Sequence, residues 1–311
     1  MAAVSHPRSV AVTGGSGFIG SAVVREALRQ GCSATSLIRE CEPRLELSGL
    51  RTRVVDWAEP TGLRELLAEA SPDAIVHCAG SSARSSESAS SIYEANVAIT
   101  WRLLDAVAAA CPRAQVVLLS SAAVYGPEPQ VPTSETAVLD PRTHYAHSKV
   151  LAEGAARAFA DVAGVRAVIA RPFNVIGPGE PAGSVVERIG RQIIAADFDP
   201  EVRLREVVSV RDFVDVDDVA RALLVLAAFG EAGTAYNICG GQGTSIRDLV
   251  SAGAAAWGRT ARIVVEEPDA SATVSLGDPA LLRLLGWEPQ VSLEQSMGRV
   301  LAVIAARAEE G

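Results

Sequence analysis

Lysine is almost absent from this 311-residue chain. The sequence contains 28 lysine and arginine residues together, and Lys149 is the only lysine among them. Arginine supplies the positive charge everywhere else, so a general need for charge does not explain Lys149. It ends the segment YAHSK at 145–149, which begins with Tyr145. An ammonium is a compact point charge, whereas a guanidinium is a wide planar fork. Position 149 is therefore a candidate for chemistry that arginine cannot perform.

The chain also lacks a net positive charge and long apolar runs. With 37 acidic residues its net charge is −9, which argues against nucleic-acid or anionic-membrane partners, since these need a basic patch. The longest apolar run, ALLVLAAF at 222–229, is too short to span a bilayer. The segment MAAVSHPRSV at 1–10 has no apolar signal core. We therefore expect a cytoplasmic protein with no membrane or nucleic-acid partner.

Cysteine and histidine are scarce, and neither has the spacing of a disulfide or metal site. The five cysteines are scattered without a CxxC pair, as in a chain kept reduced in the cytosol. His144 and His147 flank Tyr145 without the cysteine or carboxylate spacing of a metal site. His77 lies in an apolar run and is expected to be a hydrogen-bonded core residue. The segment DFVDVDDVA at 212–220 is typical of a helix N-terminus, where negative charge is favourable. No metal is expected.

Apolar strand-like runs alternate with helical patterns through the first half of the chain. The expected strands are 8–14, 33–38, 52–57, 73–80, 114–121 and 166–172, and the expected helices are 18–31, 62–70, 90–110 and 144–164. This alternation predicts an α/β fold of the Rossmann type, a doubly wound parallel sheet. Glycine and proline cluster after Pro172. We expect a dinucleotide-binding domain over 1–172, to which the chain returns near 211–240, and a smaller substrate-binding region over 173–311.

A glycine turn follows the first expected strand. The segment VTGGSGFIG at 12–20 places Gly14, Gly17 and Gly20 three residues apart. In a strand–turn–helix context the first glycine allows a tight turn and the second lets the backbone approach a pyrophosphate. The third lets the helix pack on the strand, and the helix N-terminus then faces the anion. The turn predicts a dinucleotide site.

The end of the second strand helps to choose the cofactor. A carboxylate there would bind the adenosine ribose hydroxyls and favour NAD. The strand ends instead in SLIRE, with Ile38 at the expected acid position and Arg39 after it. Arginine suits a 2′-phosphate, so NADP is favoured. The alternative is NAD, with Arg39 a surface residue and Glu40 supplying the carboxylate.

Tyr145 and Lys149 lie one turn apart on an expected helix, hence on one face. Tyrosine is a poor acid or base near neutral pH, because its pKa is about 10. A neighbouring ammonium lowers that pKa, and it can also reach a ribose hydroxyl. Ser121 ends the fifth strand at the ligand-binding edge of such a sheet. Ser120 should point the other way by strand alternation. The expected catalytic group is Ser121, Tyr145 and Lys149.

Taken together, these segments resemble the extended short-chain dehydrogenase/reductase family, the NAD-dependent epimerases and dehydratases. The matching segments cover most of the chain: TGGSGFIG, VVDW, HCAG, NVAITWRLL, SSAAVYG, YAHSK, RPFNVIGPGE, VRDFVDVDDVA and YNICGGQGTSIRDLV. Several others, among them ERIGRQIIAA and FGEAGTAYNICGGQ, look most like the GDP-4-keto-6-deoxymannose reductases. That resemblance implies hydride transfer from NADPH to a sugar ketone, with Tyr145 giving the proton and Ser121 holding the oxygen. Lys149 would poise Tyr145 and grip the nicotinamide ribose.

The resemblance also implies further site residues. Phe18 and Ile19 would join the glycine turn at the cofactor, with Asp56 and Trp57 near the adenine. Asn96 would support the active-site helix. Others would line the cofactor (Ala79, Gly80 and, at the nicotinamide, Pro172) or meet the substrate, commonly a sugar nucleotide (Ser82, Asn174 and Arg211). Members usually form homodimers through the helices expected here at 90–110 and 144–164.

Two alanines narrow the reaction. The similar 4,6-dehydratases carry an acidic residue after the serine to eliminate water, but this chain has Ala122 and Ala123 there. Elimination is therefore disfavoured, which leaves a reductase or a nucleotide-sugar epimerase that keeps its NAD bound. A reductase of a non-nucleotide ketone and a non-catalytic NADP-binding regulator stay open, although such regulators typically lose the tyrosine or the lysine.

The protein is expected to bind the diphosphate of a sugar nucleotide weakly. Relatives usually offer a second arginine besides the one that matches Arg211, about ten residues before the Asp of a GDP-like segment. Counting back from Asp278 reaches Pro268, which Glu266 and Glu267 precede. Carboxylates would repel the diphosphate, unless another arginine such as Arg188 or Arg205 reaches the site.

Overall fold

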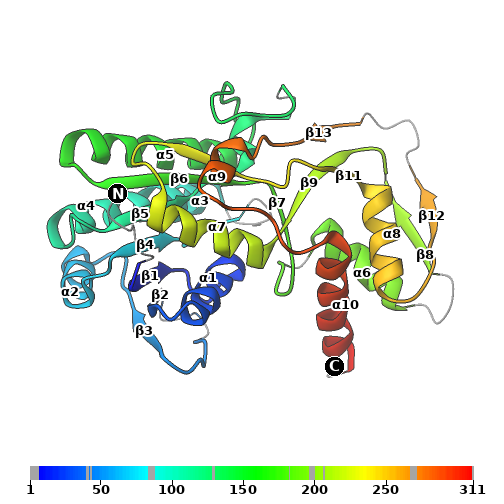
Figure 1. Cartoon of the computed structure of the whole chain (residues 1–311), viewed down its shortest axis with the longest axis horizontal. Coiled ribbons are helices and arrows are strands. Elements are labelled where there is room, and N and C mark those ends of the chain that lie inside the picture. The colour runs from blue at the N-terminus through cyan, green and yellow to red at the C-terminus, as the bar shows by residue number, and fades with distance from the viewer. Residues whose placement is uncertain are drawn as a thin grey trace.

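Seven parallel strands form the central sheet, in the order β10-β6-β5-β4-β1-β2-β3 (Figure 1). The computed structural model describes residues 7–39, 42, 44–82, 88–127, 130–181, 183–195, 200–205, 207–266 and 272–309. The strands are β1 (Ser9–Thr13), β2 (Ser33–Ile38), β3 (Leu50–Val54), β4 (Ala74–His77), β5 (Gln115–Leu119), β6 (Arg166–Pro172) and β10 (Ala235–Ile238). This is the predicted Rossmann-type doubly wound sheet.

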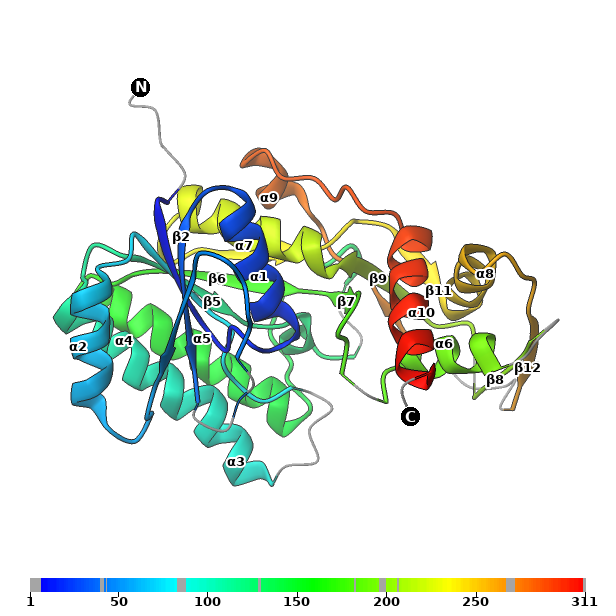
Figure 2. The same cartoon turned by 90° about the horizontal axis from the view of Figure 1, so that it is seen from below.

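Helices cover both faces of this sheet, which is why its inner strands are apolar on both sides. On one side lie α1 (Phe18–Arg29) and α7 (Val216–Phe229), and on the other lie α2 (Pro60–Ala70), α4 (Ile99–Ala110) and α5 (His144–Ala163) (Figure 2). Strand alternation divides the core between the two layers. Val10 and Val12 pack with α1 and α7, whereas Ala11 packs with α2, α4 and α5.

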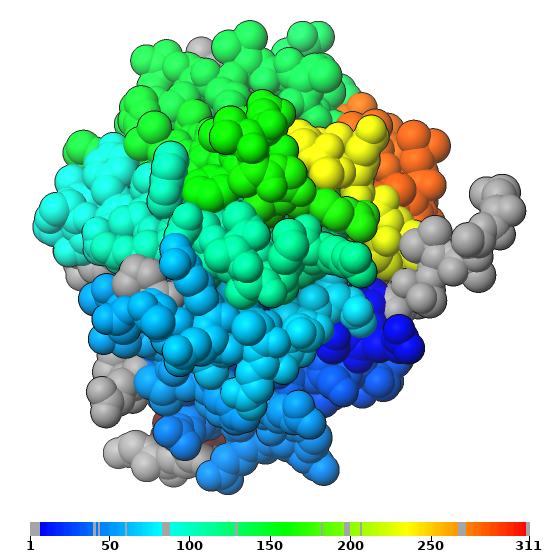
Figure 3. All heavy atoms as spheres, turned by 90° about the vertical axis from the view of Figure 1, so that its left-hand side faces the viewer, coloured from blue at the N-terminus to red at the C-terminus, as the bar shows by residue number. Residues whose placement is uncertain are grey.

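The two edges of the sheet have different surroundings. The turns that enter β4, β5, β6 and β10 lie at the amino edge, where Figure 3 shows their light blue, teal, green and yellow segments closely packed. In the middle of the sheet, β1 pairs with β2 on one side and with β4 on the other. The direction of the chain order reverses between these two pairs. At the carboxyl ends of the strands such a switch point leaves a crevice in which ligands bind.

A second lobe follows β6 and has its own core. Its strands are β7 (Asn174–Ile176), β9 (Val210–Asp215), β11 (Gly243–Ser245) and β13 (Val274–Ser275) in one small sheet, with β8 (Glu201–Leu204) and β12 (Arg262–Val265) as a separate pair. Its helices are α6 (Val185–Ala195), α8 (Ile246–Ala256) and α10 (Leu293–Glu309), and the short α9 (Ala280–Leu284) lies beside β10. Ile189, Leu249 and Leu301 are among the side chains of this separate core.

The strands expected over 52–57, 73–80 and 114–121 end earlier in the structure, at Val54, His77 and Leu119. Strand β3 ends at Val54 rather than at 57, because the Asp56 carboxylate accepts a hydrogen bond from the Ala58 amide and starts a turn. The helix expected over 90–110 consists of α3 (Ala89–Tyr93), a π-helical turn over Glu94–Ala98, and α4. Apolar periodicity continues across the π turn and so conceals it. Such turns are frequent at functional sites, and this one contains Asn96.

The Asp-rich segment is a helix start, as predicted. Asp215 caps α7 by accepting from the Asp217 amide, and Asp217 and Asp218 lie in its first turn. No helix among the described residues is long and apolar enough to cross a membrane. The described part of the chain likewise holds no cluster of metal-binding side chains.

Candidate cofactor and catalytic site

The glycine turn has the close approaches that its spacing predicted. Gly14 has a φ of +63°, and a Cβ there would lie 2.9 Å from the Ala79 backbone. A Cβ on Gly20 would lie 2.1 Å from the Gly14 oxygen, so helix α1 can rest on the turn only without that atom. Gly17 precedes α1 and has no side chain to cap it. The first amides of α1 are thus open to an anion.

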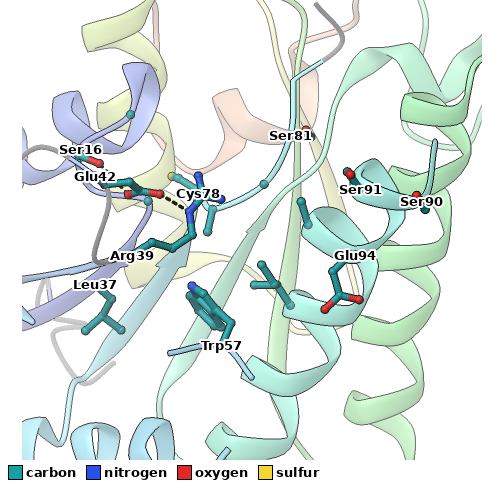
Figure 4. Close-up of a pocket in the computed structure, with 16 residues that line it drawn as sticks. Ser16, Leu37, Arg39, Glu42, Trp57, Cys78, Ser81, Ser90, Ser91 and Glu94 are labelled. Carbon is teal, nitrogen blue, oxygen red and sulfur yellow. Dashed lines mark hydrogen bonds and ion pairs between the residues drawn. The ribbon is translucent and has the colours of Figure 1, made fainter. Parts of the chain in front are cut away.

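A cavity of about 940 Å³ opens beside this turn (Figure 4). The predicted cofactor residues that line it are Gly14, Gly17, Arg39, Trp57, Ala79 and Gly80. Its other lining residues are Ser16, Leu37, Glu42, Cys78, Ser81, Ser90, Ser91, Glu94, Ala95 and Ile99. Gly80 has a φ of +151°, and a Cβ would lie 2.3 Å from Asn96 Oδ1. The cavity wall at Gly14 and Gly80 has no side chains, and the N-terminus of α1 has no side-chain cap. Both features suit the binding of a dinucleotide.

Four other residues expected at the cofactor, Phe18, Ile19, Asp56 and Pro172, are not among those that line the cavity. Phe18 and Ile19 begin α1 and pack against the core. The Asp56 carboxylate holds the turn after β3 and does not line the cavity. Pro172 ends β6 beside Ile238 of β10.

The end of the cavity next to β2 holds a charged pair that the sequence did not indicate. Arg39 Nε donates to Glu42 Oε1 at 2.7 Å, and the Ser16 hydroxyl donates to Glu42 Oε2 at 2.8 Å. Ile38 is buried and cannot serve a ribose. Glu40, the alternative acid, lies outside the described residues, and Glu42 is a carboxylate that lines the cavity beside Arg39.

Ser121, Tyr145 and Lys149 come together at the carboxyl edge of the sheet. Ser121 follows β5 and caps a short 3-10 helix, Ala122–Tyr125, and its hydroxyl lies close enough to the Tyr145 phenol to lower the pKa of that phenol. Lys149 Nζ donates to the Leu119 carbonyl at 2.9 Å and lies 5.8 Å from the centre of the Tyr145 ring. The three side chains are not among those that line the cavity, but Cys78, which lines it, acts on the pKa of Lys149.

The spacing of Tyr145 and Lys149 predicted a lowered pKa for Tyr145, but in the structure this pKa is raised. Burial raises the pKa of Tyr145, and the nearby Ser121 hydroxyl lowers it by less. Burial also lowers the pKa of Lys149 to about 8, against the opposing attraction of Cys78 and Glu153. The ammonium is directed at the Leu119 carbonyl rather than at the phenol. Tyr145 therefore keeps its proton at neutral pH, which suits a proton donor.

Asn96 ties the cavity wall to the catalytic helix. Its Oδ1 accepts from the Ser81 amide at 2.9 Å, and its Nδ2 donates to the Ser148 hydroxyl at 2.9 Å. That hydroxyl donates to the Tyr145 carbonyl at 2.7 Å. Asn96 thus holds α5 in register with the loop after β4, in agreement with its expected supporting place.

His77 is a neutral core residue, as predicted. The Thr100 hydroxyl gives its proton to the Asn96 carbonyl, so His77 Nε2 must donate to Thr100. Nδ1 then accepts from Thr13 at 2.7 Å. Burial lowers the pKa of His77 to about 3, which keeps the ring neutral.

A buried ion pair that the sequence analysis missed lies behind the catalytic group. Glu153 accepts from Arg171 Nε at 2.9 Å and from Nη2 at 2.6 Å, and both side chains are buried. Glu153 also accepts from the Ser120 hydroxyl at 2.6 Å, while Arg171 Nη1 donates to the Tyr125 hydroxyl. The sequence signal was a glutamate one turn after Lys149 on the same helix face.

The expected substrate residues lie in and near the second lobe. Asn174 Nδ2 donates to the Asp212 carbonyl at 3.3 Å. Arg211 Nη1 donates to the Thr273 carbonyl at 2.8 Å and Nη2 to its hydroxyl at 2.7 Å. Ser82 is exposed after β4. Of the acidic segment, Glu266 continues the β8–β12 pairing, whereas Glu267 and Pro268 lie outside the described residues.

The sheet order, the glycine turn at its switch point and the Ser–Tyr–Lys group together define an NAD(P)-binding Rossmann-type enzyme site. The chain belongs to the NAD dependent epimerase/dehydratase family, whose sequence profile matches residues 10–239.

Curated relatives include both reductases and epimerases. The chain is 33% identical to GDP-6-deoxy-D-mannose reductase of Pseudomonas aeruginosa, over 82% of this chain and 87% of that protein. It is 30% identical to dTDP-6-deoxy-L-talose 4-dehydrogenase (NAD(P)(+)) of Kitasatospora kifunensis, over 94% of each. It is 31% identical to UDP-glucose 4-epimerase of Mycolicibacterium smegmatis, over 93% and 96%.

Solved structures share the fold over nearly the whole chain. RMD from Pseudomonas aeruginosa complexed with NADPH has 30% identity and a TM-score of 0.80, covering 96% of this chain and 99% of that one. The UDP-glucose 4-epimerase of Thermus thermophilus in complex with NAD has 26% identity and a TM-score of 0.81, with the same coverage. Both cofactors are thus found on this fold.

Proposed function

We propose that this protein is an NAD(P)-dependent ketoreductase acting on a keto group of a nucleotide-linked deoxysugar. The observation that carries this is the catalytic group itself. The Tyr145 phenol lies near the Ser121 hydroxyl and keeps its proton, and Lys149 Nζ lies 5.8 Å from the centre of the Tyr145 ring. A proton donor held next to a second hydroxyl matches what a ketone oxygen needs as it becomes an alcohol.

The roles of the three side chains follow from this arrangement. A bound NADPH supplies the hydride. Ser121 donates to the ketone oxygen and fixes its position beside Tyr145, whose hydroxyl gives up the proton. The Lys149 ammonium stabilises the phenolate that remains, since an opposite charge nearby favours the ionised form. One of its three donors is on the Leu119 carbonyl, and another would suit a ribose hydroxyl of the cofactor.

Reduction is favoured over elimination of water. Ala122 and Ala123 occupy the 3-10 helix that follows Ser121, where similar dehydratases carry an acid. The relatives that reduce or oxidise deoxysugars at 30–33% identity support the same reaction and a sugar-nucleotide substrate.

An epimerase that keeps NAD bound is the second candidate. The 31% identity to UDP-glucose 4-epimerase over 93% of the chain favours it, as does the Glu42 carboxylate, which could accept from ribose hydroxyls. The same three side chains would then take and give back the hydroxyl proton, while the bound cofactor would accept the hydride and return it to the other face of the sugar.

The second lobe, residues 173–311, is the proposed substrate-binding region, with residues 1–172 and the return near 211–240 binding the dinucleotide. The separate core of the second lobe and the entry of β10 into the main sheet support this division. Asn174, Arg211 and Ser82 would meet the substrate. The Thr273 contacts of Arg211 support weak diphosphate binding, since they already use one donor on each of its Nη atoms.

A cytoplasmic homodimer through α4 and α5 is also part of the proposal. Trp101, Leu151 and Val162 on these helices are exposed, and the Trp101 ring meets Phe159 edge-on. Apolar side chains on adjacent helices suit a partner of the same kind. Sedimentation of the wild type beside Trp101→Glu with Leu151→Glu checks this.

The reaction is tested with purified protein, NADPH and a nucleotide-linked 4-keto-6-deoxysugar. The expected result is loss of NADPH absorbance in step with formation of a hydroxyl sugar. Oxidised NAD released from the denatured protein, together with epimerisation without added cofactor, would favour the epimerase instead.

A further inference from the structure

Glu42 occupies the place beside β2 where a dinucleotide's adenosine ribose meets the protein. In sheets of this type the end of the second strand faces that ribose. Arg39 follows β2, and Ser16 belongs to the glycine turn. Figure 4 shows Ser16, Glu42 and Arg39 grouped on one side of the cavity, across from Ser90, Ser91 and Glu94. The Glu42 side chain is only 20% exposed, against 60% for Arg39.

The two groups that hold Glu42 are those that would hold a phosphate. A guanidinium and a hydroxyl are typical phosphate donors, and here both donate to the Glu42 carboxylate. A 2′-phosphate could reach Arg39 and Ser16 only by displacing the carboxylate, and it would meet a like charge there. A 2′-hydroxyl has no such conflict, because it can donate to the carboxylate.

We propose that Glu42 is an internal substitute for the 2′-phosphate and sets the balance between NADPH and NADH. Arg39 alone would make the site strongly selective for NADPH. With Glu42 in place, NADPH binding breaks one ion pair and one hydrogen bond, whereas NADH binding breaks neither. This inference rests on the proposed function only in taking NAD(P) as the cofactor, and it goes beyond it by assigning the residue that tunes the choice.

The test measures binding of two adenosine fragments by calorimetry, without sugar or turnover. Adenosine 2′,5′-bisphosphate carries the 2′-phosphate and 5′-AMP does not, so the ratio of their dissociation constants isolates this end of the cavity. In Glu42→Ala and Glu42→Gln, the preference for the bisphosphate is expected to rise about threefold to tenfold, since an ion pair no longer opposes it and a like charge is gone. In Arg39→Ala it is expected to fall about tenfold or more.

A double-mutant comparison of Arg39 and Glu42 distinguishes the proposed role of Glu42 from a general effect of its charge. In an Arg39→Ala background, Glu42→Ala still removes the like charge but has no ion pair to release, so it should change the ratio less than in the wild type. Glu46→Ala is the matched control: it removes the same charge from the same loop, at an exposed position that does not line the cavity. Its ratio should equal that of the wild type.

Three results would overturn the proposal: an unchanged ratio in both Glu42 variants, an equal shift in Glu46→Ala, or equal weakening of both fragments. Thermal unfolding of each variant shows whether it is folded. If the wild type bound neither fragment, NAD(P) use and the proposed function would fall together with this assignment. If it binds both and only the ratio fails to respond, the proposed function stands and the role of Glu42 does not.

Discussion

Asn96 and Lys149, which support the catalytic group, are buried side chains on helical segments, whereas Arg39 and Glu42 at the adenosine end are more exposed and lie on or next to loops. Asn96 and Lys149 are 1% and 8% exposed, and each is held by backbone or buried partners. Arg39 and Glu42 follow β2 and are paired mainly with each other and Ser16 among the contacts described. Proton and hydride transfer require reacting atoms held in a fixed geometry. The choice between NADPH and NADH depends only on the balance of charge around the adenosine ribose. The catalytic end should therefore respond to substitution far more strongly than the adenosine end.

The largest effect is expected at Tyr145. Tyr145→Phe keeps the ring packing and removes the proton, and general acid groups contribute typically about 10²–10⁴-fold. Turnover should fall by that factor while calorimetry finds NADPH affinity nearly unchanged. Retention of more than about a tenth of wild-type kcat, with chemistry shown to be rate-limiting, would remove Tyr145 from this role.

The buried ion pair behind the catalytic group comes next. Glu153→Ala leaves the Arg171 guanidinium buried without its carboxylate, which typically costs about 3–5 kcal/mol in the free energy of unfolding. Urea denaturation measures it. The matched control is Asp105→Ala, which breaks an exposed ion pair with Arg64 and should cost less than about 1 kcal/mol. Similar costs for the two variants would show that burial does not distinguish these regions.

The charge of Lys149 predicts the pH dependence. Its pKa is lowered to about 8, so the ammonium is present below that pH and is lost as the pH rises through it. If the ammonium stabilises the Tyr145 phenolate, kcat/KM should fall above about pH 8. A kcat/KM that stays level well beyond that pH would contradict the assigned role.

The same lowered pKa makes a prediction for stability. Between about pH 8 and the ordinary lysine value the unfolded chain binds more protons than the folded one. The free energy of unfolding of the cofactor-free protein should therefore rise with pH across this window. Lys149→Met should lack that rise, and an identical pH profile for the variant would locate the effect elsewhere.

The smallest effect is expected at Arg211. Its donors already bind the Thr273 carbonyl and hydroxyl, so Arg211→Ala should change nucleoside diphosphate affinity by less than about tenfold, below the cost of a full charge-assisted contact. Calorimetry with GDP, UDP and dTDP checks it. Low-micromolar binding by the wild type that disappears in Arg211→Ala would restore ordinary diphosphate recognition.

The sequence predicted the parts of this site that depend on local pattern. Alternating periodicities predicted the sheet, the glycine spacing predicted the turn around Gly14, and the helical spacing placed Tyr145 beside Lys149. Features that depend on tertiary packing were missed or predicted wrongly. Glu42 lies in a segment without periodicity. The direction of the Tyr145 pKa shift depends on burial, which spacing does not reveal.

Isotope transfer from the cofactor tests the ketoreductase proposal most directly. Purified protein is given NADPH deuterated at the transferred position, with a nucleotide-linked 4-keto-6-deoxysugar, and the product is analysed by mass spectrometry and NMR. The account predicts one deuterium per product, on the carbon that was the ketone, with an equal amount of NADP formed. Product without deuterium, or an epimerised sugar with no NADPH consumed, would contradict it.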